Sequence, residues 1–338
     1  MDELGAQLTA AWLTTVLQAH EHLAAGQVHE IHHVRPVDYL HSWHIYFSAR
    51  YTADAAPTLP QHLFLKLGKP HSLASARREA AFYARIAPHL DAVPLVPCYG
   101  TGLLAGATPY VLLADLSPSH HTLADGVSLA HFEAMVAVLA QLHAACWERH
   151  DLLATLEQPD EVVAGMCPDP DAQYADLRMH LGDVLTARQR QVLQRYLRAA
   201  PARFRQHLQQ GAALTLCHPD NIATNFLFPR QPGAPVYLID WHVYRVWWGP
   251  LDLAALLTRP GPAQPAQRDT LLRSYHTQLL AQGVTNYRWE RCLLEYRLGV
   301  IDTLRVVLNI RHIPQLALQN LVGIMDEFER QACWELLN

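Results

Sequence analysis

The sequence that decides the fold of this chain lies between Leu214 and Leu257. It contains three successive segments, CHPDNIATNFLF (217–228), VYLIDWH (236–242) and GPLDLAALL (249–257). His218, Asp220 and Asn225 fall on one short polar stretch between two apolar runs, and Asp240 closes the second run. Polar stretches between short apolar runs are typical of loops between strands. The pattern therefore predicts that an amide, an imidazole and two carboxylates are delivered to one place.

The spacing of these residues indicates a specific chemistry. His-x-Asp-x4-Asn, followed by an apolar strand that ends in Asp, is the arrangement that phosphoryl-transfer enzymes of the protein-kinase kind use. In this interpretation Asp220 orients an acceptor hydroxyl and takes its proton, while Asn225 and Asp240 bind Mg²⁺ as hard oxygen ligands. The alternative is ordinary turn chemistry, in which such side chains bond nearby backbone. The complete spacing between apolar strands favours the catalytic interpretation.

The same region resembles a known family, the aminoglycoside phosphotransferase and choline kinase-like small-molecule kinases, which have a protein kinase-like fold. Residues 239–241 (IDW) match the family's magnesium-binding strand end, and residues 249–254 (GPLDLA) look like its Gly-x-x-Asp-Leu-Ala signature. Residues 111–117 (VLLADLS) resemble the lobe-connecting segment of the ecdysteroid kinase-like branch, with Ala114 where Glu is usual. The resemblance covers roughly residues 25–310, and it is specific for fold and reaction but not for the acceptor.

The resemblance implies a lysine on the third strand, paired with a glutamate on the following helix. Lys66 ends an apolar run and Glu79 lies in the helical stretch after it. Taken singly, each has a simpler explanation, a strand-end lysine reaching to water and a solvated helix face. Only two of the 26 cationic residues are lysine, however, so a lysine at this position indicates a need for a compact ammonium. We expect Lys66 to hold the α- and β-phosphates and Glu79 to fix its direction.

The resemblance also implies roles for residues around these. The loop between the first two strands (36–42) lacks the glycines of protein kinases, which leaves Ser42 and its backbone N–H as the expected phosphate contact. The adenine is expected against the backbone of Leu113, Ala114 and Leu116. His218 is expected to be structural, and Asp252 to anchor the backbone of the catalytic loop. The sequence leaves open whether Trp241 and the aromatic residues after it form core or floor the acceptor pocket.

The periodicity along the chain predicts an α+β, two-lobe, protein kinase-like fold. An N-lobe (1–115) is expected to hold an antiparallel sheet plus a helix, and a mainly helical C-lobe (116–338) the catalytic loop, the magnesium site and the acceptor site. A break is expected at Pro201 within the helical region 171–210. The remaining expected elements are two strands in 28–52 around a bend at 38–42, strands at 62–67, 95–100 and 109–116, and helices at 8–23, 72–88, 127–149 and within 268–337.

The composition of the chain indicates which classes of partner to expect and in which cellular compartment the protein is expected. The chain of 338 residues has a net charge of −5 and no clustered basic excess, which argues against a nucleic-acid partner. Its six cysteines are far apart and form no Cys-x-x-Cys pair, so reduced thiols in a cytoplasmic protein are expected. No basic flank precedes the first apolar run, and no later run approaches ~18 residues, so neither export nor membrane insertion is expected.

These observations predict an ATP- and Mg²⁺-dependent kinase that phosphorylates a hydroxyl of a small molecule. The alternatives are a non-catalytic kinase-like protein that binds a nucleotide or another ligand, and a protein kinase, for which an Ala-Pro-Glu element is missing. From residue 259 onward arginines are about as numerous as acids, which disfavours polycationic aminoglycosides. A neutral or weakly charged, partly apolar alcohol fits the aromatic content better. The sequence leaves the acceptor and the choice between ATP and GTP open.

Overall fold

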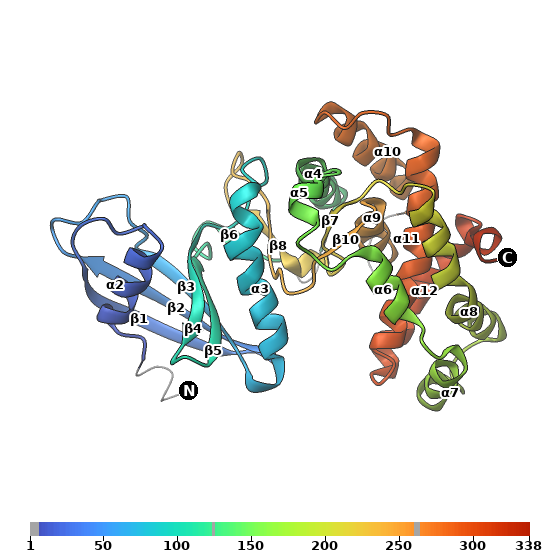
Figure 1. The fold of residues 1–338 in the computed structure, drawn as a ribbon, viewed down its shortest axis with the longest axis horizontal. Coiled ribbons are helices and arrows are strands. Elements are labelled where there is room, and N and C mark those ends of the chain that lie inside the picture. Colours follow the sequence, from blue (N-terminus) through green and yellow to red (C-terminus); the bar gives the residue numbers. More distant parts are fainter. Residues whose placement is uncertain (1–6, 124–125, 260–263) are drawn as a thin grey trace. The chain divides into compact units, whose positions relative to one another are not determined.

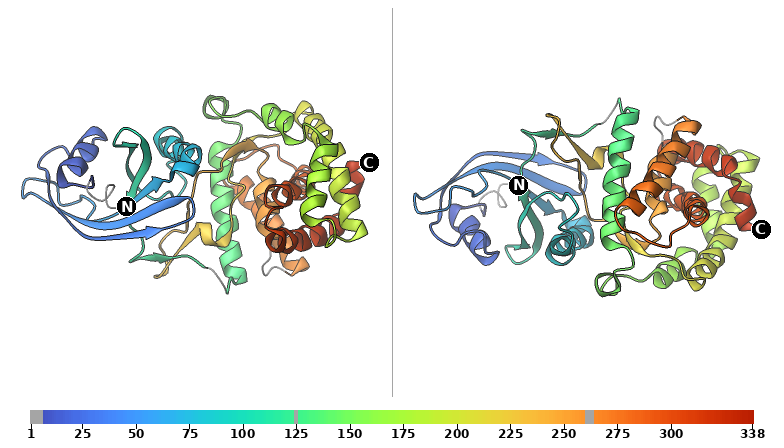
Figure 2. Two further views of the ribbon diagram at one scale, coloured as in Figure 1. Left: turned by 90° about the horizontal axis from the view of Figure 1, so that it is seen from below. Right: turned by 90° about the horizontal axis from the view of Figure 1, so that it is seen from above.

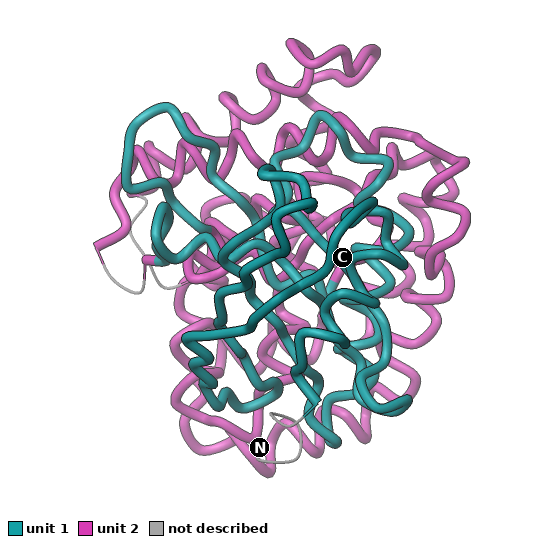
Figure 3. The backbone as a smooth tube through the Cα atoms, turned by 90° about the vertical axis from the view of Figure 1, so that its left-hand side faces the viewer, with its two compact units in different colours: residues 1–122, 227–243 teal, residues 123–226, 244–338 magenta. Residues whose placement is uncertain are grey.

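The computed structural model describes residues 7–123, 126–259 and 264–338, which fold into two compact units. Unit 1 consists of Met1–Thr122 together with Leu227–Val243, and unit 2 of Leu123–Phe226 together with Tyr244–Asn338 (Figure 3). The first six residues of the expected N-lobe lie outside the described residues. The assignment of functions to lobes 1–115 and 116–338 stays a prediction.

Unit 1 is built on a five-stranded antiparallel sheet in the order β1-β2-β3-β5-β4 (Figure 1). Its first two strands meet at the predicted bend, and two helices, α2 and α3, pack against the sheet. The bounds are α2 (Ala10–Ala19), β1 (Val28–Asp38), β2 (Ser42–Tyr51), β3 (His62–Gly68), α3 (Leu73–Arg85), β4 (Cys98–Leu104) and β5 (Thr108–Ala114), with short 3₁₀ turns at Pro70–Ser72 and Ala87–His89.

The two faces of this sheet differ because side chains alternate along each strand. On one face the leucines of β3 and the apolar residues of β2 join the buried cluster that includes Leu13 and Leu17 of α2. The other face carries His44 and Lys66, which are directly paired across β2 and β3. Alternation in the sequence thus places an apolar core on one face and an ionisable pair on the other.

The segment 227–243 returns to unit 1 through a second, small sheet. This sheet has the order β6-β8-β9, with bounds β6 (His120–His121), β8 (Phe226–Pro229) and β9 (Tyr237–Leu238). His120 pairs with Pro229, and the backbone N–H of Arg230 donates to the carbonyl of Ser119 at 2.8 Å. These bonds attach to unit 1 the stretch that ends in Asp240.

Unit 2 is largely helical and has one two-stranded sheet, β7 paired with β10. Figure 2 shows α11 among the other helices of the unit, and it packs on α8, α9 and α12. The bounds are α4 (Leu129–Cys146), α5 (His150–Leu153), α6 (Pro159–Met166), α7 (Pro170–Leu181), α8 (Ala187–Gln209), β7 (Thr215–Cys217), a 3₁₀ turn at Ala223–Asn225, β10 (Arg245–Trp247), α9 (Pro250–Thr258), α10 (Pro265–Ala281), α11 (Trp289–Asn309), α12 (Pro314–Arg330) and a last 3₁₀ turn at Cys333–Leu337.

The fold class predicted from the sequence is confirmed, whereas the break at Pro201 is wrong. Helix α8 continues through Pro201 without interruption. Proline removes one helical hydrogen bond, but Leu197, Ala200 and Phe204 around it are buried, and tertiary packing supplies most helix stability in proteins. The aromatic residues that could have floored a pocket, Trp241, Trp247 and Trp248, are fully buried core residues.

Helix α4 is long and apolar enough to cross a membrane by length and composition alone. Half of that stretch is buried inside the protein, where α4 packs on α10 and β7. Ser128 caps its first turn by accepting a hydrogen bond from the backbone N–H of His131. This burial is the one expected of a helix in the core of a folded domain.

Candidate active site

The first group of predicted site residues is assembled within unit 1 around Lys66. The Lys66 side chain lies on β3, and its Nζ is 2.7 Å from Oε2 of Glu79 on α3. Glu79 is buried with Phe82 and Tyr83 on the side of α3 that packs on the sheet. The ion pair predicted between strand and helix is therefore present, and it holds the ammonium in a fixed direction.

Asp240 binds the same ammonium from the segment that returns to unit 1. Its Oδ1 is 2.5 Å from Lys66 Nζ and 3.0 Å from Nδ1 of His242. The Asp240 backbone has φ 68°, a left-handed conformation that is strained for a residue other than glycine and typical of functional sites. Trp241 fixes the segment because its ring stacks on Phe82 with centroids 3.9 Å apart.

Electrostatics hold this cluster in its charged form. Burial lowers the pKa of Lys66, but attraction to Glu79 and Asp240 outweighs it and leaves that pKa well above its ordinary value. For Asp240, burial raises the pKa, while the hydrogen bond from His242 and the charge of Lys66 bring it far below the ordinary value. Lys66 is thus an ammonium and Asp240 a carboxylate across the physiological pH range.

His44 is a member of this cluster that the sequence reasoning missed. It lies directly across from Lys66, and its Nε2 is 2.9 Å from the Ser42 hydroxyl. Burial, followed by repulsion from Lys66, lowers the pKa of His44 to about 4, so its imidazole is neutral at pH 7. The sequence did not reveal this pairing, because the register between β2 and β3 depends on the connection at 52–61, which lacks a two-residue hairpin turn.

The loop between β1 and β2 is held by side-chain contacts in place of glycines. Lys69 forms an ion pair with Asp38, and Nδ1 of His41 is 3.0 Å from the hydroxyl of Ser72. Nε2 of His71 is 2.9 Å from the carbonyl of Leu40. These contacts tie both ends of the loop to the turn that follows β3, and they place Ser42 at the start of β2.

The residues expected near the adenine lie at the end of β5. Leu113 pairs with Phe64 and Ala114 with Leu63, so both belong to the sheet. The Ala114 N–H donates to the carbonyl of Pro97 at 2.9 Å. The Leu116 carbonyl accepts a hydrogen bond of 2.8 Å from the His120 N–H.

The second group of predicted residues is assembled within unit 2 on the loop that follows β7. The Nδ2 group of Asn225 donates to the carbonyl of Asp220 at 2.8 Å and to its Oδ2 at 3.2 Å. Because the amide nitrogen of Asn225 is engaged in the loop, its carbonyl oxygen is the atom that a cation could bind. Carboxylate and amide oxygens are suitable ligands for Mg²⁺, so Asn225 and the ionised Asp240 fit a magnesium ion by their chemistry.

A buried network of hydrogen bonds holds the backbone of this loop. Oδ2 of Asp252 accepts the backbone N–H of His218 at 2.6 Å and lies 3.1 Å from Nε2 of His143. Nδ1 of His143 is in turn 2.7 Å from the hydroxyl of Tyr275. A side chain at Gly249 would have its Cβ 2.3 Å from that hydroxyl, so a larger residue there would displace Tyr275 from this network. The role expected of Asp252 agrees with this geometry, whereas His143 and Tyr275 gave no signal in the sequence.

Arg259 is a further residue that sequence reasoning missed. Its two terminal nitrogens, Nη1 and Nη2, donate to Oδ1 of Asp220 at 3.2 and 3.1 Å, and Nη2 also donates to the carbonyl of Pro219 at 3.2 Å. The carboxylate assigned to catalysis is therefore held between Asn225 on one oxygen and a guanidinium on the other.

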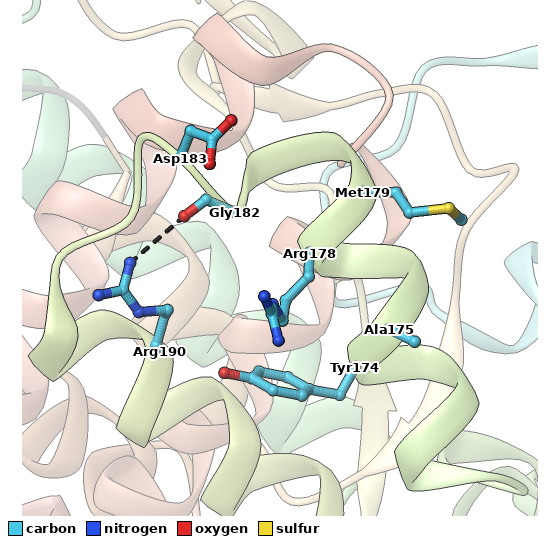
Figure 4. Close-up of a pocket in the computed structure, with 7 residues that line it drawn as sticks. All are labelled: Tyr174, Ala175, Arg178, Met179, Gly182, Asp183 and Arg190. Carbon is cyan, nitrogen blue, oxygen red and sulfur yellow. Dashed lines mark hydrogen bonds between the residues drawn. The ribbon is translucent and has the colours of Figure 1, made fainter.

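A pocket elsewhere in unit 2 contains none of the predicted site residues. It has a volume of about 670 Å³ and is formed by α7, the start of α8 and the turn between them (Figure 4). Nη1 of Arg190 donates to the carbonyl of Gly182 at its edge, 3.3 Å away. It is lined by Tyr174, Ala175, Arg178, Met179, Gly182, Asp183 and Arg190.

Three solved structures share the fold at low identity. A choline kinase from Cryptosporidium parvum Iowa II has a TM-score of 0.58 at 10% identity, with 90% of this chain and 91% of that chain covered. A macrolide 2′-phosphotransferase from Brachybacterium faecium has a TM-score of 0.53 at 18% identity, with coverage of 90% and 92%. A choline kinase from Streptococcus pneumoniae has a TM-score of 0.52 at 15% identity, with coverage of 87% and 95%.

A search of curated protein sequences gave no match. The sequence model of the phosphotransferase enzyme family, in contrast, matches residues 48–291, which include every predicted site residue except Ser42. The match spans most of the chain and contains both groups of site residues. The chain therefore belongs to the phosphotransferase enzyme family.

Proposed function

We propose that this protein is a kinase that transfers the γ-phosphoryl group of ATP to a hydroxyl group of a small molecule. The observation that carries the proposal is Lys66, held at hydrogen-bond distance by both Glu79 and Asp240 within unit 1. In this type of chemistry a strand lysine that is oriented by a helix glutamate contacts the nucleotide phosphates, and a nearby aspartate binds Mg²⁺. Family membership supports the phosphotransferase reaction, and ATP is the donor that we propose.

The residues of unit 1 would bind the nucleotide. Lys66 would contact the α- and β-phosphates, and Ser42 would approach them from the start of β2. His44 is neutral at pH 7 and therefore adds no second cation beside Lys66, although its ring lies on the same face of the sheet. The backbone from Leu113 to Leu116 would meet the adenine.

The residues of unit 2 would act on the acceptor. Its hydroxyl oxygen would form a bond to the γ-phosphorus while the bond to the bridging oxygen of ADP breaks, and ADP leaves with that electron pair. Asp220 would orient the hydroxyl and take its proton. Asn225 and Asp240 would hold Mg²⁺, which when bound neutralises charge on the phosphates.

The test is Mg²⁺-dependent ADP release, measured over a broad panel of hydroxylated metabolites and antibiotics. Once an acceptor is found, Asp220→Asn is expected to lower kcat by about 10²- to 10⁴-fold, the usual contribution of a general base. Nucleotide binding should be retained, because Asp220 belongs to the acceptor side of the reaction. Asp171→Asn is the matched control, since Asp171 is an exposed aspartate of unit 2 that also pairs with an arginine, Arg198.

Full ATP-dependent transfer by the Asp220→Asn protein would refute the assigned mechanism. Nucleotide binding without ADP release across the whole panel would favour a non-catalytic binding protein. Phosphorylation of a generic peptide, but of no small hydroxyl compound, would favour a protein kinase.

A further inference from the structure

Arg259 is placed on the catalytic carboxylate by the helix that also supports the catalytic loop. Helix α9 begins at Pro250, and in its first turn Asp252 binds the backbone N–H of His218. The same helix ends at Thr258, and Arg259 is its C-cap residue. Every residue of α9 is buried. Asp252 and Arg259 therefore contact the catalytic loop from the two ends of one fixed helix.

A second helix fixes the end of α9. Gly323 of α12 approaches Thr258 so closely that a Cβ at Gly323 would lie 2.1 Å from the Thr258 carbonyl oxygen. The backbone next to Arg259 is therefore held by close packing. The side chains of Arg259 and Asp220 nevertheless remain 20% and 33% exposed, so a molecule in solution can reach both groups.

This position gives Arg259 a direct effect on the acceptor. A hydroxyl that approaches Asp220 must come within a few ångströms of the guanidinium, which lies 3.1 Å from the same carboxylate oxygen. Arginine presents five N–H donors in a planar fork that matches a carboxylate or phosphate, and the hydrogen bonds of Arg259 to other described residues engage only Nη1 and Nη2. An ammonium at the same place would be repelled.

The C-terminal helices supply an independent observation. Acceptors with several positive charges need unpaired carboxylates, yet seven of the eight acidic residues between 264 and 338 form ion pairs with arginine. The eighth, Glu290, is exposed in the first turn of α11, and no ion pair to it is found among the described residues. The seven paired residues are Asp269, Glu295, Asp302, Asp326, Glu327, Glu329 and Glu335.

From these contacts we infer that Arg259 determines acceptor specificity, and that the acceptor carries an anionic group, a carboxylate or a phosphate, close to the hydroxyl that is phosphorylated. The inference rests on the proposed function. The anionic group would share the guanidinium with Asp220 and bring the hydroxyl to a remaining lone pair of that carboxylate. The two sources of the anion differ in charge and shape, and separate acceptors distinguish them.

The experiment compares acceptors that share one carbon skeleton. A hydroxy acid, its neutral amide and the corresponding amino alcohol are tested for Mg²⁺-dependent ADP release, and a phosphorylated alcohol of similar length forms a fourth arm. We expect the wild-type protein to prefer an anionic member over its neutral partner in kcat/KM by about ten- to a hundredfold, because hydrogen bonds to charged groups have that strength.

Variants of Arg259 separate specificity from a structural role. Arg259→Ala should lose the preference for the anionic acceptor, so that kcat/KM falls more for the hydroxy acid than for the neutral amide, with the difference between the two acceptors chiefly in KM. Arg259→Lys should keep part of the preference, and Arg259→Glu should favour the amino alcohol. Arg198→Ala is the matched control because it removes an exposed arginine from a similar pair with Asp171 in the same unit.

A wild-type protein that prefers the neutral or the cationic member would overturn the inference while leaving the proposed kinase function intact. An unchanged ratio between anionic and neutral acceptors in Arg259→Ala would also overturn it. Absence of Mg²⁺-dependent nucleotide binding in the wild-type protein would instead reject the proposed function, and the inference with it.

Discussion

At the scale of single residues, two histidines next to Asp240 have opposite protonation behaviour. Burial and Lys66 lower the pKa of His44 to about 4. His242 is also partly buried, which lowers its pKa, but its hydrogen bond to Asp240 and the charge of that carboxylate raise the pKa above the ordinary value. The charge of the neighbouring group thus decides whether the pKa of each histidine is lowered or raised. The two residues should therefore contribute to pH-dependent stability in opposite directions.

We predict that His44 reduces stability in acid. Between about pH 6.5 and 4 the unfolded chain binds a proton at this position and the folded chain does not, so the stability falls as the pH falls. This linkage amounts to at most about 3 kcal/mol. His44→Gln should therefore lose less stability than the wild-type protein between pH 7.5 and 4.5, as measured by urea unfolding.

His242→Gln is the matched variant, because the stability contributed by a raised pKa is complete below about pH 6.5 and is lost as the pH rises through the folded value. The free energy of unfolding of His242→Gln should therefore be closer to that of the wild-type protein at high pH than at low pH. The interpretation would be rejected if both variants changed the pH dependence in the same direction.

At the scale of elements, close helix packing determines where the two ends of helix α9 lie. Gly323 of α12 abuts the last carbonyl of α9, and Gly249 before α9 abuts Tyr275 and His143. Neither glycine has a positive φ. Glycine is therefore needed at both positions because a side chain would lack space, and not because of the backbone conformation. These approaches involve residues far apart in the sequence, which explains why periodicity alone did not reveal them.

We predict that Gly323→Ala destabilises the protein by about 1–3 kcal/mol or more, the usual range for overpacking, even though alanine is the better helix former. The added Cβ would meet a backbone carbonyl that cannot rotate away, so α12 or α9 must shift. Chemical denaturation measures the effect. Gly165→Ala on α6 is the control, since no atom lies within 4 Å of the added Cβ, and it should be neutral or stabilising.

The strands and helices of unit 1 were largely predictable from local pattern, whereas α8 shows the limit of that approach. The bend at 38–42 and the strand positions follow from alternation and turn residues. Pro201 indicated a break because proline is the strongest local signal against helix. Burial of the residues around it, which no local rule records, keeps the helix continuous.

At the scale of the whole molecule, the stretch that decides the fold is divided between the two units. Residues 227–243 carry Asp240 into unit 1, while the segments before and after them, with Asp220 and Asp252, belong to unit 2. Lys66 and Asp240 are thus in contact although they are 174 positions apart in the chain. A single contiguous stretch of sequence therefore supplies residues to both halves of the proposed chemistry.

We predict that ATP with Mg²⁺ stabilises the folded protein, whereas ATP with EDTA does so less. A ligand at a hundred times its Kd contributes about 2.7 kcal/mol, which should raise Tm by a few degrees. Lys66→Ala should abolish most of the shift, because it removes the proposed phosphate contact and leaves Glu79 buried without its partner. Arg198→Ala should retain it. Equal shifts with and without Mg²⁺ would contradict the assignment of Asn225 and Asp240 as metal ligands.

The sequence by itself determined features that depend on local order. These are the polar loop, the strand end at Asp240, the two lysines of the chain and the pattern of the two lobes. Only the tertiary structure decided which groups meet. It placed Arg259 on Asp220, His44 across from Lys66, and His143 behind the loop through Asp252. The physical reason is that spacing constrains neighbours within a turn or strand, whereas contacts between distant residues, and the charges and pKa values that follow from them, depend on how the elements pack.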